Sequence, residues 1–268
     1  MVSLTYIVME VVVSVLREDP LIAAMAIERP LPLHESSRRL RELYPACPRV
    51  YGVAVLADVC RRRWWPLASA LTTDRLRVMF DNAAADMGRS AAARQLADTL
   101  VHTVIGRVVA LVVLEGRAWD PGLENLWVHV DAEGAIDWVA VVDPTLRGLA
   151  HDAELCKVVR LPSESALAVW VAHRCHRTLA PLFAKLHEVS TAAIPVATMW
   201  QLVGSAVVAA ATQVPQLAGT CELTGMRRGQ AVLEALVDFG LPVRGPSVRR
   251  RRRQSSSGLA KLGQPCLC

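Results

Sequence analysis

Three polar residues flank one predicted β-hairpin and are the first candidates for chemistry. Asn125 precedes the first strand, His129 lies within it, and Asp143 follows the second strand. We expect their side chains to converge at one end of the hairpin and to bind a ligand there. Asn and Asp at that place can orient a phosphate-bound Mg²⁺ or a polar ligand. The alternative is that Asn125 and Asp143 only form turns, which both residue types favour.

Cysteines and histidines supply two further candidates, both for metal binding. Cys266 and Cys268 end the sequence, and two thiolates are half of the four-cysteine set that holds a [2Fe–2S] cluster. The alternative is a frayed chain end. His173, Cys175 and His176 follow one another on a predicted helix, with the two histidines at i and i+3. No second cluster has suitable spacing, so a partly exposed helix with a buried cysteine is favoured.

Basic residues gather in two places. The run Arg61-Arg62-Arg63-Trp64-Trp65 can bind an aromatic or anionic ligand, or nucleic acid by stacking. We favour a helix whose arginine stems lie over apolar surface. The run at 249–253 suits phosphates, but a solvated tail is favoured and no nucleic-acid partner is expected. The sequence has no glycine-rich phosphate loop, no G-x-S-x-G and no H-E-x-x-H, so several enzyme classes lack support.

The hairpin is the element that must position the first three candidates. Leu126 to Val130 and Ile136 to Val142 are rich in Val, Ile and Trp, and Asp131-Ala132-Glu133-Gly134 supplies a turn between them. A period of two places Trp127 and His129 on one face of the first strand. On the second strand it groups Ile136, Trp138, Ala140 and Val142 on one face, and Asp137, Val139 and Val141 on the other. An isolated hairpin is only marginally stable, so we expect further strands within residues 1–90.

Helical patterns dominate the remainder. Ser90 is the expected cap of a helix that ends before Gly116, with one apolar face made of Leu96, Leu100, Val104, Val108 and Leu111. Ser163 is the expected cap of a helix through Trp170 to Cys175, and Pro181 the start of a shorter helix that ends near Glu188. A helix around Trp200 follows, and a last one runs from Arg227 to Phe239. The fold class is therefore α+β, a small antiparallel sheet around a central hairpin with a mostly helical C-terminal half.

Composition sets the wider bounds. The 268 residues carry a net charge of +5, but seven basic residues and no acidic ones lie from Arg244 onward. Without them 23 basic residues stand against 25 acidic ones, so the body of the chain is near −2. We expect a poorly interpretable region at 1–90, a domain at 91–243 and a basic, disordered tail at 244–268. The seven cysteines are scattered and odd in number, and no signal peptide is recognisable, which favours the cytoplasm.

The segment around Trp200 raises the question of a membrane span, because no charged residue lies between Glu188 and Glu222. Its composition favours a buried helix, since small residues dominate it and glutamines interrupt it. We expect close packing at Gly204, Ser205, Ala206 and Ala209, and no stable membrane insertion.

Several segments together resemble a known family. These are Gly106 to Ala110, Leu114 to Pro121, Glu124 to Val128 and Val142 to Thr145, followed by Met199 to Ala206. The pattern is similar to that of the ferric-siderophore reductase (FhuF-like) family, a domain shared with the C-terminal part of aerobactin-type siderophore synthetases (IucA/IucC-like). The similarity covers roughly residues 90–243 and has no self-identifying catalytic signature.

The resemblance implies a cytoplasmic protein that binds a ferric siderophore and reduces Fe(III), with an electron donor that the sequence does not name. It adds Trp200 to the ligand-binding candidates Asn125, His129 and Asp143, and it implies a C-terminal [2Fe–2S] cluster as the cofactor. Family reductases hold that cluster with adjacent cysteines followed by C-x-x-C. This chain has only Cys266 and Cys268 there. The alternatives are a non-redox siderophore-binding domain and a siderophore-synthetase-like domain.

Overall fold

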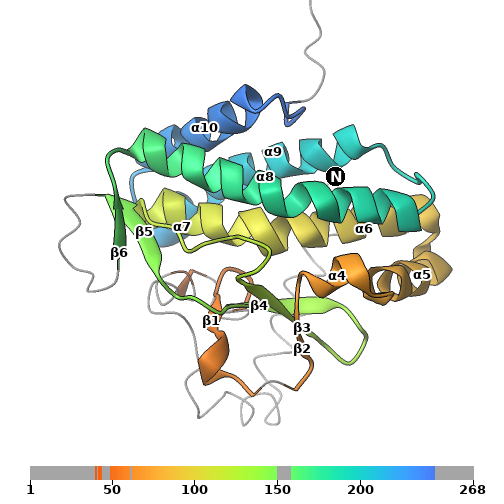
Figure 1. Cartoon of the computed structure of the whole chain (residues 1–268). Helices are drawn as coiled ribbons and strands as arrows, with labels where there is room; N and C mark the ends of the chain where they lie inside the picture. Colours follow the sequence, from red (N-terminus) through yellow and green to blue (C-terminus); the bar gives the residue numbers. More distant parts are fainter. Residues whose placement is uncertain (1–39, 41, 44–48, 61, 150–157, 245–268) are drawn as a thin grey trace, which may run out of the picture.

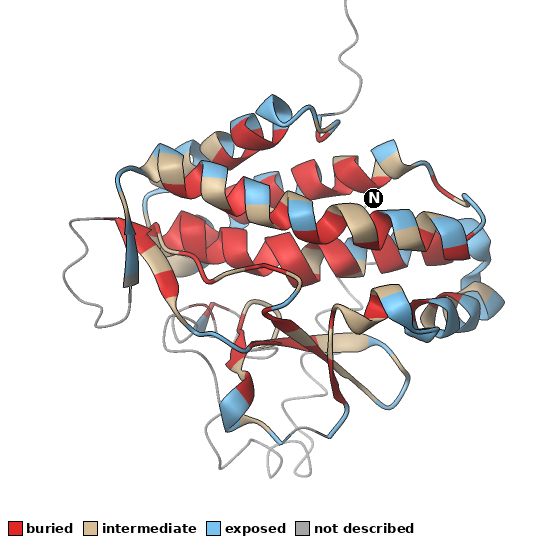
Figure 2. Ribbon diagram, viewed as in Figure 1, coloured by how far each residue is buried: buried red, intermediate tan, exposed pale blue. Residues whose placement is uncertain are grey.

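A layer of helices covers one side of a small β-sheet in the computed structural model (Figure 1). The structure describes residues 40, 42–43, 49–60, 62–149 and 158–244. The expected α+β class with a mostly helical C-terminal half is confirmed. One large hydrophobic core joins residues from Leu40 to Val243, and the buried residues lie where the helices face one another and the sheet (Figure 2).

The main sheet has four strands in the order β1-β4-β3-β2. They are β1 (Ala54–Val55), β2 (Trp64–Pro66), β3 (Leu126–Val130) and β4 (Ile136–Val141). The hairpin is β3–β4, and both added strands come from residues 1–90, as expected. β2 is antiparallel to β3, but β1 is parallel to β4. The sheet is therefore mixed, because the long chain between β1 and β4 permits the crossover that a parallel pair needs.

A β-bulge interrupts the hairpin. His129 lies opposite Trp138 and Val130 lies opposite Ile136, so no residue of β3 lies opposite Asp137. The expected grouping of Asp137 with Val139 and Val141 is therefore wrong. Asp137 is the extra residue of the bulge, and the bulge turns its side chain toward His129, which it contacts.

The two faces of the sheet bury different residues. Toward the helices lie Leu126, Val128, Val139, Val141 and Trp65. The opposite face buries a smaller cluster that contains Ala54, Leu56, Trp64, Trp138 and Ala140. Neighbouring residues Trp64 and Trp65 thus bury opposite sides of one strand. The helix expected for this basic-aromatic run is wrong. Trp64 and Trp65 belong to strand β2, and their indoles point to opposite faces of the sheet. Arg63, just before the strand, adopts a positive φ of 65°.

Several short elements complete this half of the molecule. They are η2 (Leu56–Asp58), α4 (Ser69–Thr72) and α5 (Arg75–Met87). A separate parallel pair consists of β5 (Leu146–Leu149) and β6 (Val158–Leu161). An antiparallel bridge between Ala118 and Arg147 ties β5 to the segment after Gly116.

The central helix is continuous through α6 (Arg89–Val101), the π-helical turn η3 (His102–Gly106) and α7 (Arg107–Glu115). Its five predicted core positions are all buried. It ends at Gly116, in the left-handed conformation with φ 68°, as expected. The expected cap is wrong, because Gly88 rather than Ser90 occupies the N-cap. Within the described residues, Arg89–Glu115 is also the one helix long and apolar enough to cross a membrane, and 83% of its apolar window is buried.

α8 (Glu164–Val189) is a single helix. The Ser163 side chain accepts a hydrogen bond from the Ala166 N–H at 3.1 Å, which confirms the predicted cap. The separate helix expected to begin at Pro181 is wrong. Proline removes one backbone N–H, but Leu179, Leu182 and Phe183 around it are fully buried, and their packing keeps the helix intact.

α9 (Val196–Ala218) and α10 (Glu222–Asp238) pack closely together. Helix α10 begins five residues before the predicted Arg227 and ends beside Gly240 as expected. A Cβ on Gly229 would lie 2.5 Å from the Cβ of Ala211, so glycine permits this approach. The expected burial of the Trp200 helix is confirmed. Close packing is confirmed at Gly204 but is wrong for Ser205, which is exposed.

Candidate functional site

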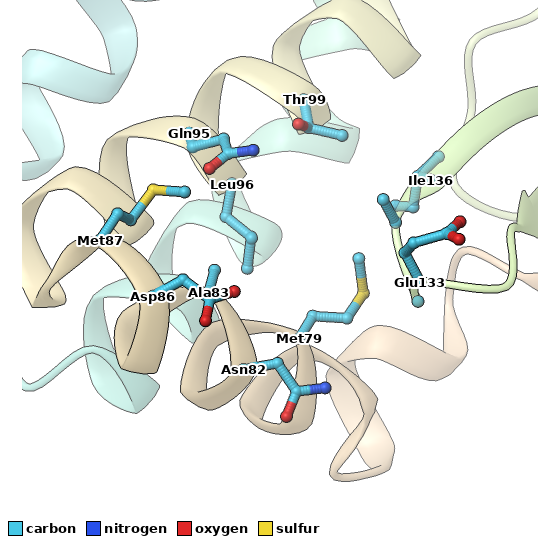
Figure 3. Close-up of a pocket in the computed structure, with 12 residues that line it drawn as sticks. Met79, Asn82, Ala83, Asp86, Met87, Gln95, Leu96, Thr99, Glu133 and Ile136 are labelled. Carbon is cyan, nitrogen blue, oxygen red and sulfur yellow. The ribbon is translucent and has the colours of Figure 1, made fainter.

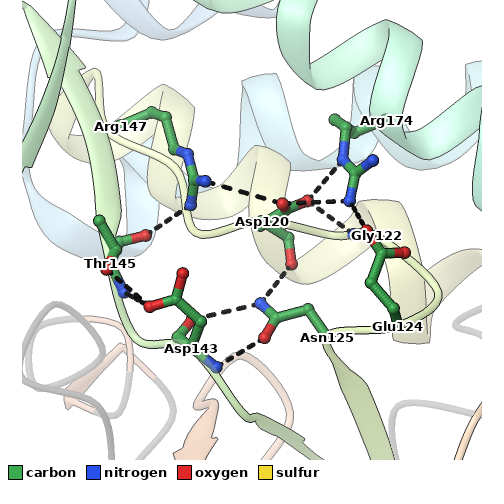
Figure 4. A network of polar contacts seen from close by, with 8 residues as sticks. All are labelled: Asp120, Gly122, Glu124, Asn125, Asp143, Thr145, Arg147 and Arg174. Atoms are coloured by element: carbon green, nitrogen blue, oxygen red, sulfur yellow. Dashed lines mark hydrogen bonds and ion pairs between the residues drawn. The ribbon is translucent and has the colours of Figure 1, made fainter.

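A network of charged and polar side chains lies where the open end of the hairpin meets α8 (Figure 4). We call it the arginine–carboxylate network; it comprises Asp120, Gly122, Glu124, Asn125, Asp143, Thr145, Arg147 and Arg174. Its members come from the turn after Gly116, from the two strand ends, from β5 and from α8. These segments are far apart in the sequence, so the network joins the sheet to the helical layer.

Arg174 and Asp120 form the centre of the network. Arg174 Nε donates to Asp120 Oδ1 at 2.7 Å, and Nη2 donates to Oδ2 at 3.1 Å. Arg174 also pairs with Glu124. The hydrogen bond to Asp120, and after it the one to Glu124, raises the pKa of Arg174. The hydrogen bond from Arg174 lowers the pKa of Glu124. Arg174 and Glu124 are therefore charged across the ordinary pH range.

Asn125 fastens the two strand ends to the turn. It is buried, and its Nδ2 donates to Asp120 O at 2.9 Å and to Asp143 O at 3.2 Å. Its Oδ1 accepts from Asp143 N at 2.7 Å. The amide thus uses both its donor and its acceptor groups on main-chain atoms, which is the pattern of a buried and satisfied side chain. The predicted neighbourhood of Asn125 and Asp143 is confirmed.

The other side of the network contains Asp143, Thr145 and Arg147. Thr145 Oγ1 donates to Asp143 Oδ1 at 2.6 Å, and this bond lowers the pKa of the Asp143 carboxyl. Arg147 lies 3.7 Å from Asp120 Oδ2 and stacks over the Trp170 ring. The charges are mutually paired and no side chain is poised as a nucleophile. The arrangement can hold the turn rigidly and present Glu124 and Asp143, which are exposed, to a ligand.

His129 lies away from this network. It lies four positions after Asn125 on an extended strand, a distance of about 13 Å. Its Nδ1 contacts Asp137 Oδ1 at 2.5 Å, and Asp137 Oδ2 pairs with Arg49 at 2.7 Å. The predicted convergence of three side chains is therefore wrong for His129, because it points toward the bulge. A carboxylate on Nδ1 fixes the ring so that Nε2 can accept a proton or bind a metal.

Trp200 is a core residue. Its ring lies edge-on to Phe183 at 5.0 Å and to His176 at 5.6 Å. His173 and His176 both contact Phe239, and Cys175 is buried, with a pKa raised by that burial. The favoured interpretation of this helix, partly exposed with a buried cysteine, is confirmed.

The described residues contain no group of three or more His, Cys, Asp or Glu side chains arranged to hold a metal ion. Their three cysteines, Cys60, Cys175 and Cys221, are all free. Cys266 and Cys268 lie outside the described residues. The donor set of a [2Fe–2S] cluster is therefore not found in the described part of the chain, and we derive no step through such a cluster.

A groove runs along α5 beside the turn of the hairpin. One part has a volume of about 180 Å³ and lies between α5, the second half of α6 and the β3–β4 turn (Figure 3). Met79, Leu96 and Ile136 form apolar walls, and Asp86 and Glu133 face it from opposite sides. The adjoining part, about 460 Å³, shares Met79, Asn82 and Gly134 with the first and reaches Trp65. Its size is that of a small-molecule site.

Sequence reasoning missed the two arginines of the network. Arg174 was assigned only to a helix, and its partner Asp120 lies 54 residues away. The signals that pointed to the region were Asn125 and Asp143, which flank the two strands of the predicted hairpin. No protein-family model, no curated protein and no solved structure matches the chain.

Proposed function

We propose that this chain is a protein of siderophore-linked iron metabolism, a cytoplasmic ferric-siderophore reductase or a relative of one. It binds a ferric siderophore and releases the iron by reduction of Fe(III) with electrons from a separate donor. What supports the proposal is the resemblance of residues 106–145 and 199–206 to the ferric-siderophore reductase family, together with one feature of the fold.

That feature is the arginine–carboxylate network. The resemblance lies in separate short segments, and polar residues from three of them bond to one another. Asp120 belongs to the segment Leu114 to Pro121, Asn125 to the segment Glu124 to Val128, and Asp143 to the segment Val142 to Thr145. The Asn125 amide bonds to main-chain atoms of both acids. Accidental matches would fall on unrelated surface positions, so a shared network favours a common architecture.

The groove along α5 supports the binding half of the proposal. It combines apolar and aromatic side chains with a few amides and carboxylates, the usual lining of a site for a small organic molecule. Its larger part can admit a chelate, and Trp65 lies in its wall, where a bound ferric chelate would quench the indole fluorescence.

The reducing half of the proposal depends on Cys266 and Cys268. Two thiolates do not complete a four-thiolate site, so the other ligands would come from elsewhere in the chain or from a second copy. The same shortage favours the second candidate function, a non-redox siderophore-binding or siderophore-synthetase-like domain.

One experiment separates the two candidates. The native chain and a Cys266→Ala, Cys268→Ala variant are reconstituted anaerobically with iron and sulfide and assayed for both. A Ser255→Ala, Ser257→Ala variant, which changes the same end of the chain and keeps every cysteine, is the control. A reductase predicts iron and sulfide in the native chain and the control, and neither in the cysteine variant. Equal incorporation in all three removes the tail from the mechanism, and none in any favours the non-redox function.

A further inference from the structure

The surroundings of Asp137, at the β-bulge of the hairpin, hold more positive than negative charge. Asp137 is bonded there by His129 and by Arg49. Behind it lies Arg107, whose side chain interacts electrostatically with Asp137. Arg107 has no ion-pair partner among the described residues, and Asp137 already uses both carboxylate oxygens. A single carboxylate therefore faces two guanidinium groups.

Arg107 is unusual because it is buried and incompletely hydrogen-bonded. It is 4% exposed, and its Nη2 donates to the Arg49 main-chain oxygen at 3.0 Å. Its Nε is buried and has no hydrogen-bond partner. Burial lowers the Arg107 pKa to about 10, so the group stays protonated at neutral pH. A buried charge without a counter-ion is costly, and such a group is normally paired.

Arg174 shows what this side of a guanidinium binds. In Arg174 the Nε and Nη2 groups hold the two oxygens of Asp120, a planar two-point match. The Nε of Arg107 lacks any such acceptor, although Arg107 is the more buried of the two. The more exposed Arg174 therefore has an acceptor for its Nε–H group, whereas the more buried Arg107 has none.

The local backbone explains how Arg107 comes to lie there. The π-helical turn His102–Gly106 directly precedes it, and such turns recur at functional sites. His102 contacts Val50 O through Nε2 at 2.7 Å, and burial lowers its pKa to about 4. His102 is therefore neutral at ordinary pH and adds no competing charge. The main chain at Arg49 and Val50 forms the wall on that side.

We propose that Arg107 binds the carboxylate of a small organic acid through its Nε–H and Nη2–H groups. The acid approaches from the side of Arg49, whose side chain is 42% exposed, and replaces the Arg49 carbonyl oxygen as the acceptor of Nη2. We choose a carboxylate as the ligand class because Asp120 supplies one to the same Nε and Nη2 groups of Arg174. This inference does not depend on the proposed function, and it assigns a ligand class to a residue that the arginine–carboxylate network does not use.

The test observes the Nε–H groups of ¹⁵N-arginine-labelled protein by NMR during titration with sodium succinate. Sodium chloride of equal ionic strength is the reference, and sodium phosphate is a second probe. The Arg107 resonance is identified as the one missing from an Arg107→Lys variant. Arg77→Lys, which changes an exposed arginine of α5, is the matched control.

The proposal expects the Arg107 signal to shift saturably with succinate and not with chloride. The same succinate should raise the melting temperature of the wild-type chain and of Arg77→Lys, and leave that of Arg107→Lys unchanged. An Arg107 signal that stays fixed throughout the succinate titration would overturn the site. Tighter binding of phosphate than of succinate would overturn the choice of a carboxylate.

Discussion

Arg174 of α8 and Asp120 of the turn after α7 form a two-point ion pair, with N–O distances of 2.7 and 3.1 Å. The pair spans 54 residues of sequence and joins the helical layer to the hairpin. Gly122 N also donates to Asp120 Oδ1, so one carboxylate orders both the turn and the helix contact.

Asp120→Asn should therefore destabilise the fold. The change removes the charge that faces Arg174 and Arg147, both partly buried, and we expect a loss of about 2–4 kcal/mol in the free energy of unfolding, as urea denaturation would measure. Glu124→Gln is the matched control, because Glu124 is 70% exposed and its loss should cost less than about 1 kcal/mol. Equal effects of the two changes would show that Asp120 does not organise the network.

Gly204→Leu should destabilise the packing of α9. A Cβ at this position would lie 1.9 Å from Val243 O, so the segment after α10 must move. We expect a loss of about 1–3 kcal/mol. Ser205→Ala, at the exposed neighbouring position, should change stability by less than about 0.5 kcal/mol. A Gly204→Leu protein as stable as wild type would mean that the close approach to Val243 is absent in solution.

The free energy of unfolding should decrease as the pH is lowered below 6.5, because His102 is buried as the neutral imidazole. Its folded pKa of about 4 lies below the ordinary value of 6.5, so between these values the unfolded chain binds a proton that the folded chain does not. Stability is complete above pH 6.5 and decreases as the pH falls toward 4, by up to about 3 kcal/mol from this group. His102→Gln can still donate to Val50 O and should lose that part of the pH dependence. Parallel curves of unfolding free energy against pH for the two proteins would refute the assignment.

Ser163→Ala should weaken the start of α8. The Ser163 side chain accepts from Ala166 N, and removal of such a cap costs about 1 kcal/mol. Ser165→Ala, an exposed change in the same first turn, should cost much less. Thermal unfolding of both variants provides the comparison, and equal melting temperatures would count against the cap.

Local pattern was sufficient to predict the hairpin and the central helix. The alternation of Val, Ile and Trp between Leu126 and Val141 has the period of a strand, and Gly116 carries the signal of a helix end. Asn125 and Asp143 could be placed together because they flank paired strands. Each of these predictions depends on residues close in sequence or joined by one short turn.

Most of the failures have one physical cause, because contacts between residues distant in the sequence decided these features. The bulge at Asp137 has no mark in the period-two pattern, so the contact with His129 could not be predicted. The helix continues through Pro181 because buried neighbours hold it. The two-residue strand β1 carries too little pattern to reveal its parallel pairing, and Arg174 meets Asp120 only through the fold.

The central claim is that the chain binds a ferric siderophore, and its most direct test is a titration of the protein's tryptophan fluorescence. The probes are ferric trihydroxamate, tricatecholate and hydroxycarboxylate chelates, each with its iron-free form and its Ga(III) complex, which is not reduced. Our account predicts saturable one-to-one quenching by at least one ferric chelate. It also predicts competition by the Ga(III) complex of that chelator and much weaker binding of the iron-free form. Saturation by none of the metal complexes would contradict the account.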